Sequence, residues 1–341
     1  MEKNDSKLAQ FKSFLLENKV PENEIPRLLE AVNGFIQFLE GENETLPTFS
    51  YGKLIEFADQ LAARNKGAAR HLIIAFWRYF PFIGMHHHME ELIDIAESAS
   101  AIDTLYDRIA NWYGEAVREE IFQGIEIPPL GAHPEKKPQV TKLVMKRLEE
   151  KLGEEKTIEL LRPCLHGGPP VGTDKERLHE LKDLDKFLKI KNQNFLNEVK
   201  QHKNDGTAMF AQLVDEEVLE YVKTIPTMGA GVRNDDKIIV TKIPYQIKQF
   251  LKADTNHMKR YYWCYCPWVR GAIKDGTEQE ISPNFCYCSG GYFKLYWDEM
   301  FDQPIKVEPL QTALWGDIVC KFAIEIPDEI MKEYVRDVTT E

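Results

Sequence analysis

The chain carries two Cys-x-Cys pairs, Trp263-Cys264-Tyr265-Cys266-Pro267 and Phe285-Cys286-Tyr287-Cys288-Ser289-Gly290-Gly291, and a further cysteine that ends Gly316-Asp317-Ile318-Val319-Cys320. We interpret residues 260–268 and 284–288 as strands that carry the two pairs. In an extended strand, residues i and i+2 point to the same face, so each pair would direct two sulfur atoms toward one place. Packing alone does not require such a concentration of thiols. We therefore expect any chemical site of the chain to lie here.

The sequence around the cysteine pairs predicts an antiparallel sheet. Residues 237–241 form a β-rich run, and residues 305–314 and 318–326 are typical of a hairpin. Ser289 is placed to cap a helix that extends through Phe301, and apolar residues on most sides of that helix indicate burial. Residues 140–341 are therefore expected to form an α+β domain that contains the cysteines.

Residues 1–125 have the periodicity of a helical bundle. Leu8, Phe11 and Leu15 recur at helical spacing, and a second such run extends from Ile25 to Leu39. The Pro-rich segment 126–139 cannot continue a helix, so we place a linker and domain boundary there. The predicted class is α+β, with an N-terminal all-helical bundle followed by an α+β domain with an antiparallel sheet.

Composition narrows the partners and the compartment. The chain has 341 residues and a net charge of -12, without a long basic tract, which disfavours nucleic acid and anionic membranes as partners. The first residues are polar, and no apolar run is long enough to span a bilayer. We expect a cytoplasmic protein. In a reducing compartment, clustered cysteines are more often metal ligands or reactive thiols than structural disulfides.

The first chemical hypothesis is a metal centre. Cys264, Cys266, Cys286, Cys288 and Cys320 are its candidate ligands, and thiolate ligands suit zinc. A flat Cys-x-Cys strand holds its two sulfur atoms roughly 7 Å apart, whereas zinc knuckles usually use Cys-x-x-Cys. One cysteine from each pair together with Cys320 is therefore an easier ligand set than all four paired thiols.

The second hypothesis is a cysteine nucleophile, Cys286 or Cys288, at the start of the predicted helix. The positive end of the helix dipole favours a thiolate there. Backbone N–H groups of Ser289, Gly290 and Gly291 are candidates to bind an anionic ligand or a developing oxyanion. The candidate bases, by position in the sequence, are His257, Glu308 and Asp317.

A structural interpretation remains open for other cysteines and histidines. Cys320 lies in an alternating apolar run, where a thiol can pack as a small hydrophobic group. In Cys164-Leu165-His166, a thiol and an imidazole lie two residues apart beside a Gly/Pro loop. They are interpreted as a buried cap, with the alternative that they form a third arm reaching the cysteine cluster. The internal run His86-His87-His88 is not favoured as a metal site, because adjacent helical residues point in different directions.

The C-terminal quarter resembles a bacterial superfamily that includes the 4-vinyl-reductase-type sensor domains and the amino-thiazoline-carboxylate hydrolase-like proteins. The matching pieces are 262–270, Cys288-Ser289-Gly290-Gly291-Tyr292-Phe293, Val307-Glu308, Gly316-Asp317 and Cys320-Lys321-Phe322. The resemblance implies an α+β domain with a pocket between sheet and helices. In the sensor branch, cysteines of this region bind zinc, which carries over to Cys286 or Cys288 and to Cys320. The sensor pattern also has a cysteine where this chain has Gln311.

The N-terminal region is similar to the helical core-binding domain of tyrosine recombinases, in residues 32–39 and the helices after them. That resemblance implies DNA binding, but acidic residues outnumber basic ones in residues 1–125. Because phosphate contacts dominate DNA affinity, this balance argues against DNA binding. We expect the helical domain to contact protein partners instead.

These observations favour a protein that binds a small molecule or a metal ion at a cysteine-lined pocket, with zinc as the candidate cofactor. Glu308 and Asp317 would orient the ligand or its neighbours. One alternative is a hydrolase in which a cysteine attacks a small heterocyclic or acyl substrate. The other is an interaction protein in which a zinc ion only stabilises the fold.

Overall fold

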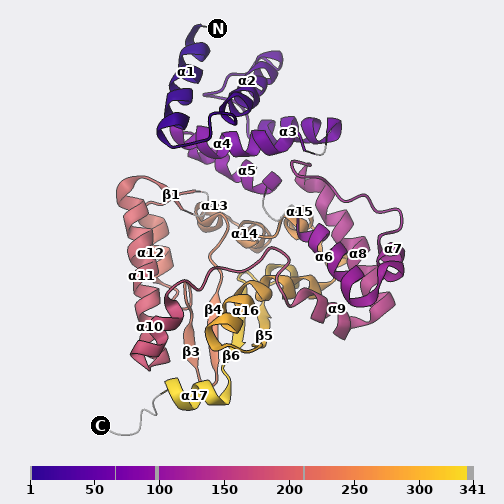
Figure 1. The fold of residues 1–341 in the computed structure, drawn as a ribbon, viewed down its shortest axis with the longest axis vertical. Coiled ribbons are helices and arrows are strands. Elements are labelled where there is room, and N and C mark those ends of the chain that lie inside the picture. The colour runs from indigo at the N-terminus through magenta and orange to yellow at the C-terminus, as the bar shows by residue number, and fades with distance from the viewer. Residues whose placement is uncertain (1, 66, 97–99, 210–211, 336–341) are drawn as a thin grey trace. The chain divides into compact units, whose positions relative to one another are not determined.

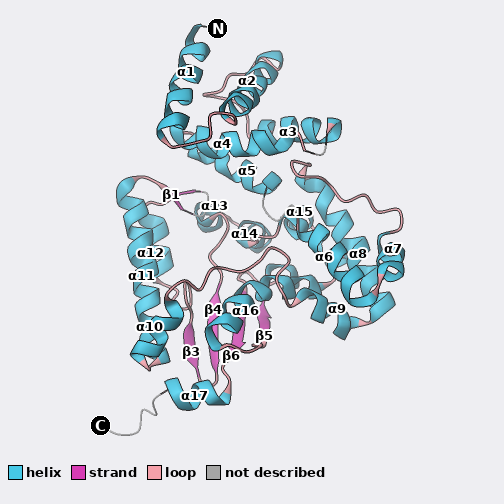
Figure 2. Ribbon diagram, viewed as in Figure 1, coloured by secondary structure: helices cyan, strands magenta, loops and turns pink. Residues whose placement is uncertain are grey.

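The computed structural model describes residues 2–65, 67–96, 100–209 and 212–335 (Figure 1). Its elements are mostly helices, with a small antiparallel sheet in the C-terminal half (Figure 2). The predicted α+β class is therefore confirmed. The chain divides into two compact units. The N-terminal unit comprises the described parts of 1–99, 128–136 and 211–213, and the large unit comprises those of 100–127, 137–210 and 214–341.

The N-terminal unit is helical, as the periodicity predicts. Its elements are α1 (Glu2–Glu17), α2 (Ile25–Gly41), α3 (Lys53–Arg64), α4 (Ala69–Ile83), a 3-10 turn (His86–His88), α5 (Met89–Ala96), a 3-10 turn (Pro134–Lys136) and β2 (Gln212–Leu213). Its core is aromatic: the Phe35 ring meets those of Phe49 and Phe76 edge to face, with centroids 5.1 Å apart in both pairs. Edge-to-face contacts of this kind add to the stabilisation from buried area.

The histidine run has a structural role through His88. Its side chain is buried, stacks on Phe49 at 3.7 Å between centroids, and contacts the buried carboxylate of Glu91. The other oxygen of Glu91 accepts the backbone N–H groups of Gly52 and Leu54, at 2.9 and 3.2 Å. Glu91 thus caps the N-terminus of α3, where unpaired N–H groups and the helix dipole both favour a negative charge.

The segment expected as a free linker, 126–139, instead packs largely into the N-terminal unit. The N–H of Gly131 donates to the Ile95 carbonyl at 3.2 Å, and the N–H of His133 donates to Asp59 at 2.8 Å. A Cβ atom on Gly131 would lie 2.3 Å from the Cβ of Ala69, so glycine permits this close approach. The preceding helix already ends at Phe122, before the first of these prolines, and the prolines do not produce an extended linker.

The predicted boundary also differs from the structural one because two more helices join the large unit. Residues 101–122 were expected in the bundle, but they bury Ile102, Leu105 and Ile109 in the core of the large unit. The helical elements of this unit before the sheet are α6 (Ala101–Tyr113), α7 (Glu115–Phe122), α8 (Lys137–Leu152), α9 (Glu154–Leu161), α10 (Asp174–Leu181), α11 (Leu184–Asp205) and α12 (Glu216–Lys223), with β1 (Ala208–Met209) between the last two. Periodicity identifies such helices, but it does not say which core receives their apolar side.

The sheet of the large unit has four antiparallel strands in the order β3-β4-β6-β5. The strands are β3 (Val232–Asn234), β4 (Lys237–Thr241), β5 (Val307–Gln311) and β6 (Lys321–Glu325). The predicted strand at 237–241 and the predicted hairpin are confirmed, with a short 3-10 turn (Ala313–Trp315) inside the hairpin connection. Ile324 and Phe322 of β6 are fully buried, as a central strand requires.

The two strands predicted to carry the cysteine pairs are wrong. Residues 260–268 comprise the end of α14 (Asn256–Trp263), a short connection that holds Cys264 and Cys266, and the start of α15 (Pro267–Asp275). Thr255 caps α14 by accepting the N–H of Met258, and Pro267 occupies the first turn of α15. These are helix-start signals that outweigh the β propensity of the aromatic residues between them.

The second pair, in contrast, lies within helical segments. Residues 284–288 belong to a 3-10 turn (Pro283–Cys286) and to α16 (Tyr287–Phe301), whose N-cap is Cys286 rather than the predicted Ser289. Ser282 accepts the N–H of Asn284, and Pro283 sits in the first turn. The remaining elements of this region are α13 (Ile247–Lys252), a 3-10 turn (Glu278–Glu280) and α17 (Asp328–Tyr334). None of the described helices has the length and apolarity that a membrane crossing requires.

Helix α16 packs closely on both sides. One side faces the sheet (Figure 1). A Cβ atom on Gly290 would lie 3.3 Å from the Phe322 ring of that sheet. The other side faces residues 162–168. A Cβ atom on Gly291 would lie 2.2 Å from the Arg162 carbonyl oxygen and 2.5 Å from the Cys164 nitrogen. The backbone of residues 162–164 therefore lies where any larger residue would place its side chain.

We expect Gly291→Ala to destabilise the large unit. Alanine in a helix normally stabilises by about 0.5–1 kcal/mol relative to glycine, but forcing a methyl group against a fixed backbone costs about 1–3 kcal/mol. The clash should dominate, and denaturant unfolding will measure it. Gly41→Ala is the matched control, because Gly41 also lies in a helix and has no atom within 4 Å of its added Cβ. Equal stability changes for the two variants would contradict the close approach.

Candidate metal and thiol site

The helical conformation sends the two cysteines of the second pair in different directions. Residues i and i+2 of a helix lie about 200° apart around its axis. Cys288, in the first turn of α16, points toward residues 164–165, whereas Cys286 contacts Thr312 in the hairpin connection. A Cys-x-Cys pair in this conformation cannot act as the two-sulfur arm expected from a strand.

The loop that receives Cys288 begins where α9 ends. Pro163 follows the last turn of α9 and cannot continue it. Arg108, from α6, donates to the carbonyl oxygens of Leu160, Pro163 and Cys164 at 2.5, 2.6 and 3.3 Å. One guanidinium group thus satisfies carbonyls at the helix end and fixes the backbone at Cys164.

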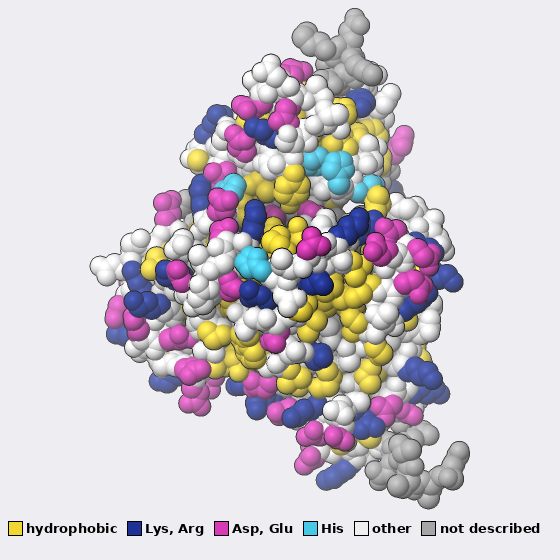
Figure 3. Space-filling view, turned by 180° about the vertical axis from the view of Figure 1, so that it is seen from behind, with side chains coloured by type: hydrophobic (Ala, Val, Ile, Leu, Met, Phe, Trp, Pro, Cys, Tyr) yellow, Lys and Arg dark blue, Asp and Glu magenta, His cyan; other side chains and the backbone are white. Residues whose placement is uncertain are grey.

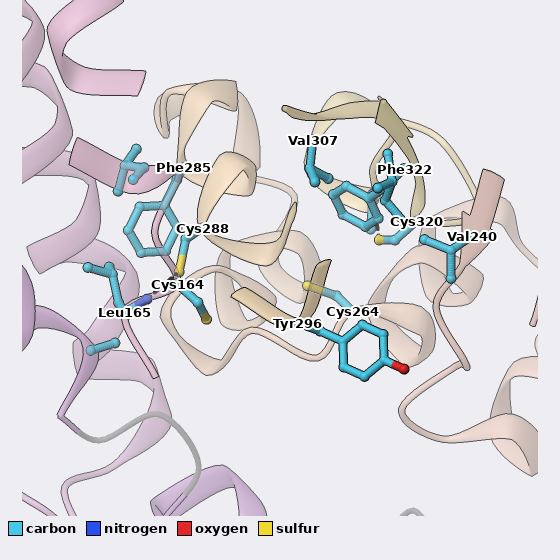
Figure 4. Close-up of a cluster of buried hydrophobic side chains, with 14 of the residues drawn as sticks. Cys164, Leu165, Val240, Cys264, Phe285, Cys288, Tyr296, Val307, Cys320 and Phe322 are labelled. Carbon is cyan, nitrogen blue, oxygen red and sulfur yellow. Dashed lines mark hydrogen bonds between the residues drawn. The ribbon is translucent and has the colours of Figure 1, made fainter. Parts of the chain in front are cut away.

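Cys164, His166 and Cys288 form the candidate site. The Cys164 sulfur lies 3.1 Å from His166 Nδ1, and the Cys288 sulfur lies 3.9 Å from the same nitrogen. All three ligand atoms are within 4.8 Å of one another. Cys164 and Cys288 are buried and His166 is exposed. Figure 4 shows the two sulfur atoms close together, with Leu165 beside them; the Leu165 N–H donates to the Cys288 sulfur at 3.5 Å.

The pKa values of the two thiols are shifted in opposite directions. The hydrogen bond from the Cys288 thiol, opposed by burial and assisted by His166, lowers the pKa of Cys164 to about 4. The same hydrogen bond, together with burial, raises the pKa of Cys288 well above its ordinary value. At neutral pH the pair therefore holds one proton on Cys288 and a thiolate on Cys164. A thiolate is both the nucleophilic and the metal-binding form of cysteine.

The spacing of the three atoms is close to that of a tetrahedral zinc site. Zn–S bonds of about 2.3 Å and Zn–N bonds of about 2.0–2.1 Å place sulfur and nitrogen ligands about 3.5 Å apart in a tetrahedron. The observed sulfur–nitrogen distances of 3.1 and 3.9 Å lie on either side of that value. Three protein ligands with an exposed histidine leave a fourth position for water or another ligand.

The structure does not gather the five thiols predicted as metal ligands into one centre. Only Cys288 joins a group of three or more ligand atoms within 4.8 Å among the described residues. Burial raises the pKa of Cys264, Cys266 and Cys286, and raises that of Cys320 to about 12. Figure 4 shows Cys264 and Cys320 apart from the Cys164–Cys288 pair. These four thiols are neutral, and Cys320 accepts the Ala313 N–H at 3.4 Å like a buried core thiol.

The raised pKa values also oppose the hypothesis that Cys286 or Cys288 is the nucleophile. The backbone at two of the predicted oxyanion donors, Gly290 and Gly291, is crowded: an added Cβ atom would lie 3.3 Å from the Phe322 ring and 2.2 Å from the Arg162 carbonyl oxygen, respectively. Ser289 accepts a hydrogen bond from Lys242 at 2.9 Å. The thiol with a lowered pKa is Cys164, which lies on the loop rather than on the helix.

The two predicted acidic residues have structural partners. Glu308 contacts Arg162 at 2.6 Å, so the residue two before Cys164 is tied to strand β5. Asp317 accepts the Thr312 N–H at 3.0 Å and closes the turn of the hairpin. His257, the candidate base, contacts the Lys274 carbonyl at 3.0 Å. Glu308 is therefore the one member of this set that supports the candidate site, through Arg162.

Acidic and basic side chains are interspersed over the face drawn in Figure 3. Hydrophobic side chains lie among them. Phosphate backbones bind best to continuous basic surfaces, which that face does not present. That the protein does not bind nucleic acid thus stays a prediction based on its charge.

The chain matches no protein-family model, no curated protein and no solved structure. The assignment of the site therefore depends on its residues. The sequence of Cys164-Leu165-His166 favours a buried cap, whereas the structure brings Cys164 and His166 to Cys288. Two signals supported the alternative: a thiol and an imidazole at i and i+2 after a helix-ending proline, and two glycines directly after them. Arg108 carried no local signal, because its partners lie more than fifty residues away.

We expect the alkylation rate of Cys164 by iodoacetamide to vary little between about pH 6 and pH 8, because its thiolate is already formed. An ordinary thiol gains about tenfold per pH unit in this range. His166→Ala should raise the pKa of Cys164 and restore a pH-dependent rate. Peptide mass spectrometry after timed alkylation measures each cysteine separately, and Cys266 serves as the internal control. A tenfold rise per unit for Cys164 in the unchanged protein would rule out the lowered pKa.

Proposed function

We propose that the large unit binds a transition-metal ion, zinc in particular, through Cys164, His166 and Cys288. The observation that supports this most directly is the convergence of three ligand atoms within 4.8 Å. Two sulfurs and an imidazole nitrogen are a ligand set that favours Zn²⁺ over Mg²⁺ or Ca²⁺. The fourth position would take water or a small-molecule ligand, in the manner of a sensor.

The surroundings of the site support metal binding. Cys164 carries the negative charge that a metal ligand needs before any ion arrives, and metal binding would displace the proton from Cys288. Arg108 and the Arg162–Glu308 pair hold the loop from both sides. Outer contacts that orient ligand residues commonly determine metal affinity. Cys288 is also one of the residues through which the sensor resemblance implies zinc binding.

We predict that the metal-free protein binds one Co²⁺ or Zn²⁺ per chain. Tetrahedral cobalt with thiolate ligands should give intense visible bands and near-ultraviolet sulfur charge transfer, which a titration follows directly. Cys164→Ser and Cys288→Ser should each abolish the charge-transfer band or weaken binding by about a hundredfold or more, whereas His166→Ala should weaken it by about ten- to a hundredfold.

Cys266→Ser is the matched control. Cys266 precedes α15 at its N-cap, where serine is a favourable residue, so the fold should tolerate the change. It also belongs to the five-thiol centre predicted from the sequence. Retained cobalt binding in this variant and loss in Cys164→Ser would support the three-ligand site. The reverse pattern would refute it and return the assignment to the Cys-x-Cys pairs.

A second candidate function is thiol chemistry, with Cys164 as the nucleophile. The lowered pKa of Cys164 and its 3.1 Å contact with His166 favour it, since a nucleophile needs a thiolate and a group that can transfer a proton. Such an enzyme would act on a small acyl or heterocyclic substrate. The alkylation rate of Cys164 by iodoacetamide, measured with and without stoichiometric zinc, distinguishes the two functions. If the three residues bind zinc, the metal should protect Cys164 and slow its alkylation. If Cys164 is a metal-free nucleophile, zinc should leave the rate unchanged.

A further inference from the structure

Lys242 lies beside the first turn of α16, where it contacts Ser289 rather than Cys288. It directly follows strand β4, and its N–H donates to the Cys320 carbonyl at 2.9 Å. Its side-chain nitrogen donates to the Ser289 hydroxyl at 2.9 Å. The same nitrogen lies 5.3 Å from the centre of the Tyr265 ring and 5.8 Å from that of Tyr292. Two aromatic rings and one hydroxyl therefore surround the ammonium group.

The ammonium group of Lys242 forms no ion pair with a described residue. The ionisable groups that it influences are the thiols of Cys264, Cys266, Cys286 and Cys320. Lys191 provides the contrast within the same unit: it too lies over a tyrosine ring, 5.0 Å from the centre of Tyr296, but it is paired with Asp174.

The polar groups at this place are donors. An ammonium group has three N–H donors, of which Ser289 takes one. The Ser289 hydroxyl, which accepts from Lys242, retains its own O–H to donate. Ser289 also lies in the first turn of α16, where the helix dipole favours negative charge. Donors without an anionic partner match the oxyanion of a carboxylate or phosphate.

The aromatic rings beside Lys242 indicate what kind of group could lie next to a bound oxyanion. Tyr292 is 39% exposed, so part of its surface faces outward beside the lysine. An exposed ring next to a cation offers a planar apolar group a surface to stack on. The arrangement therefore suits a small molecule with an oxyanion at one end and a planar body at the other.

We propose that Lys242 and Ser289 bind the oxyanion of a small organic acid whose planar part lies against Tyr292. The shared chemistry is that of an aromatic carboxylate or a phosphate ester. This site does not depend on the metal proposal, because Ser289 and Cys288 lie about 100° apart on the helix and contact different segments. Binding should persist in metal-free protein and in Cys164→Ser.

Isothermal titration of the full chain with 2-naphthoate, with the uncharged 2-naphthamide and with inorganic phosphate tests the proposal. We expect 2-naphthoate to bind and 2-naphthamide to bind weakly or not at all. Lys242→Met keeps the length of the side chain and removes its charge, so it should weaken naphthoate binding about ten- to a hundredfold. Ser289→Ala should weaken it by a smaller factor, since it removes one uncharged donor.

Lys191→Met is the matched control, because it removes a lysine that is already paired with a carboxylate. It should leave naphthoate affinity unchanged. Phosphate binding that requires Lys242, without naphthoate binding, would support the oxyanion site and assign it to phosphate esters. Equal naphthoate affinity in the unchanged protein and a folded Lys242→Met variant would overturn the proposal, as would the absence of binding by both anions.

Discussion

The candidate site depends on one close approach, that of helix α16 to the backbone of residues 162–164. Gly291 has no side chain, so the Arg162 carbonyl and the Cys164 nitrogen occupy the space where a Cβ atom would lie. Gly168 repeats the arrangement further along, where an added Cβ would lie 2.7 Å from that of Leu295. Cys288, Gly291 and Leu295 are spaced at i, i+3 and i+7, so they share one helix face. The candidate site forms because the backbone of the loop packs directly against this helix face.

How much the sequence could predict follows from the same helix. Residues 237–241 and the hairpin were identifiable, because alternation and turn residues define antiparallel strands locally. The ligand set was not, because the hypothesis required the Cys-x-Cys pairs to be extended. In a strand, Cys286 and Cys288 would share a face, whereas in a helix they diverge by about 200°. The helical conformation therefore separates Cys286 from Cys288, while Cys264 and Cys266 lie in the connection between α14 and α15. Thr255, Pro267 and Pro283 were the local signals that pointed to helices.

Burial then separates the six thiols into two chemical kinds. Four of them, Cys264, Cys266, Cys286 and Cys320, have their pKa raised by burial and stay protonated. Cys164 is also buried, but a hydrogen bond from a second thiol and a nearby imidazole more than offset the cost of its charge. No count of cysteines in a sequence could give this distinction, because it depends on partners that are 2 and 124 residues away.

The first turn of α16 lies between two environments of opposite character. On one side, Cys288 faces a loop that carries a thiolate, a negative charge that a metal cation would neutralise. On the other, Ser289 faces a lysine without a carboxylate partner, a positive charge that an oxyanion would neutralise. Adjacent residues of a helix point about 100° apart, so one turn can serve both without bringing the charges into contact. A cation bound on one side and an anion bound on the other would each stabilise the folded chain, because each would bind groups that only the fold brings together.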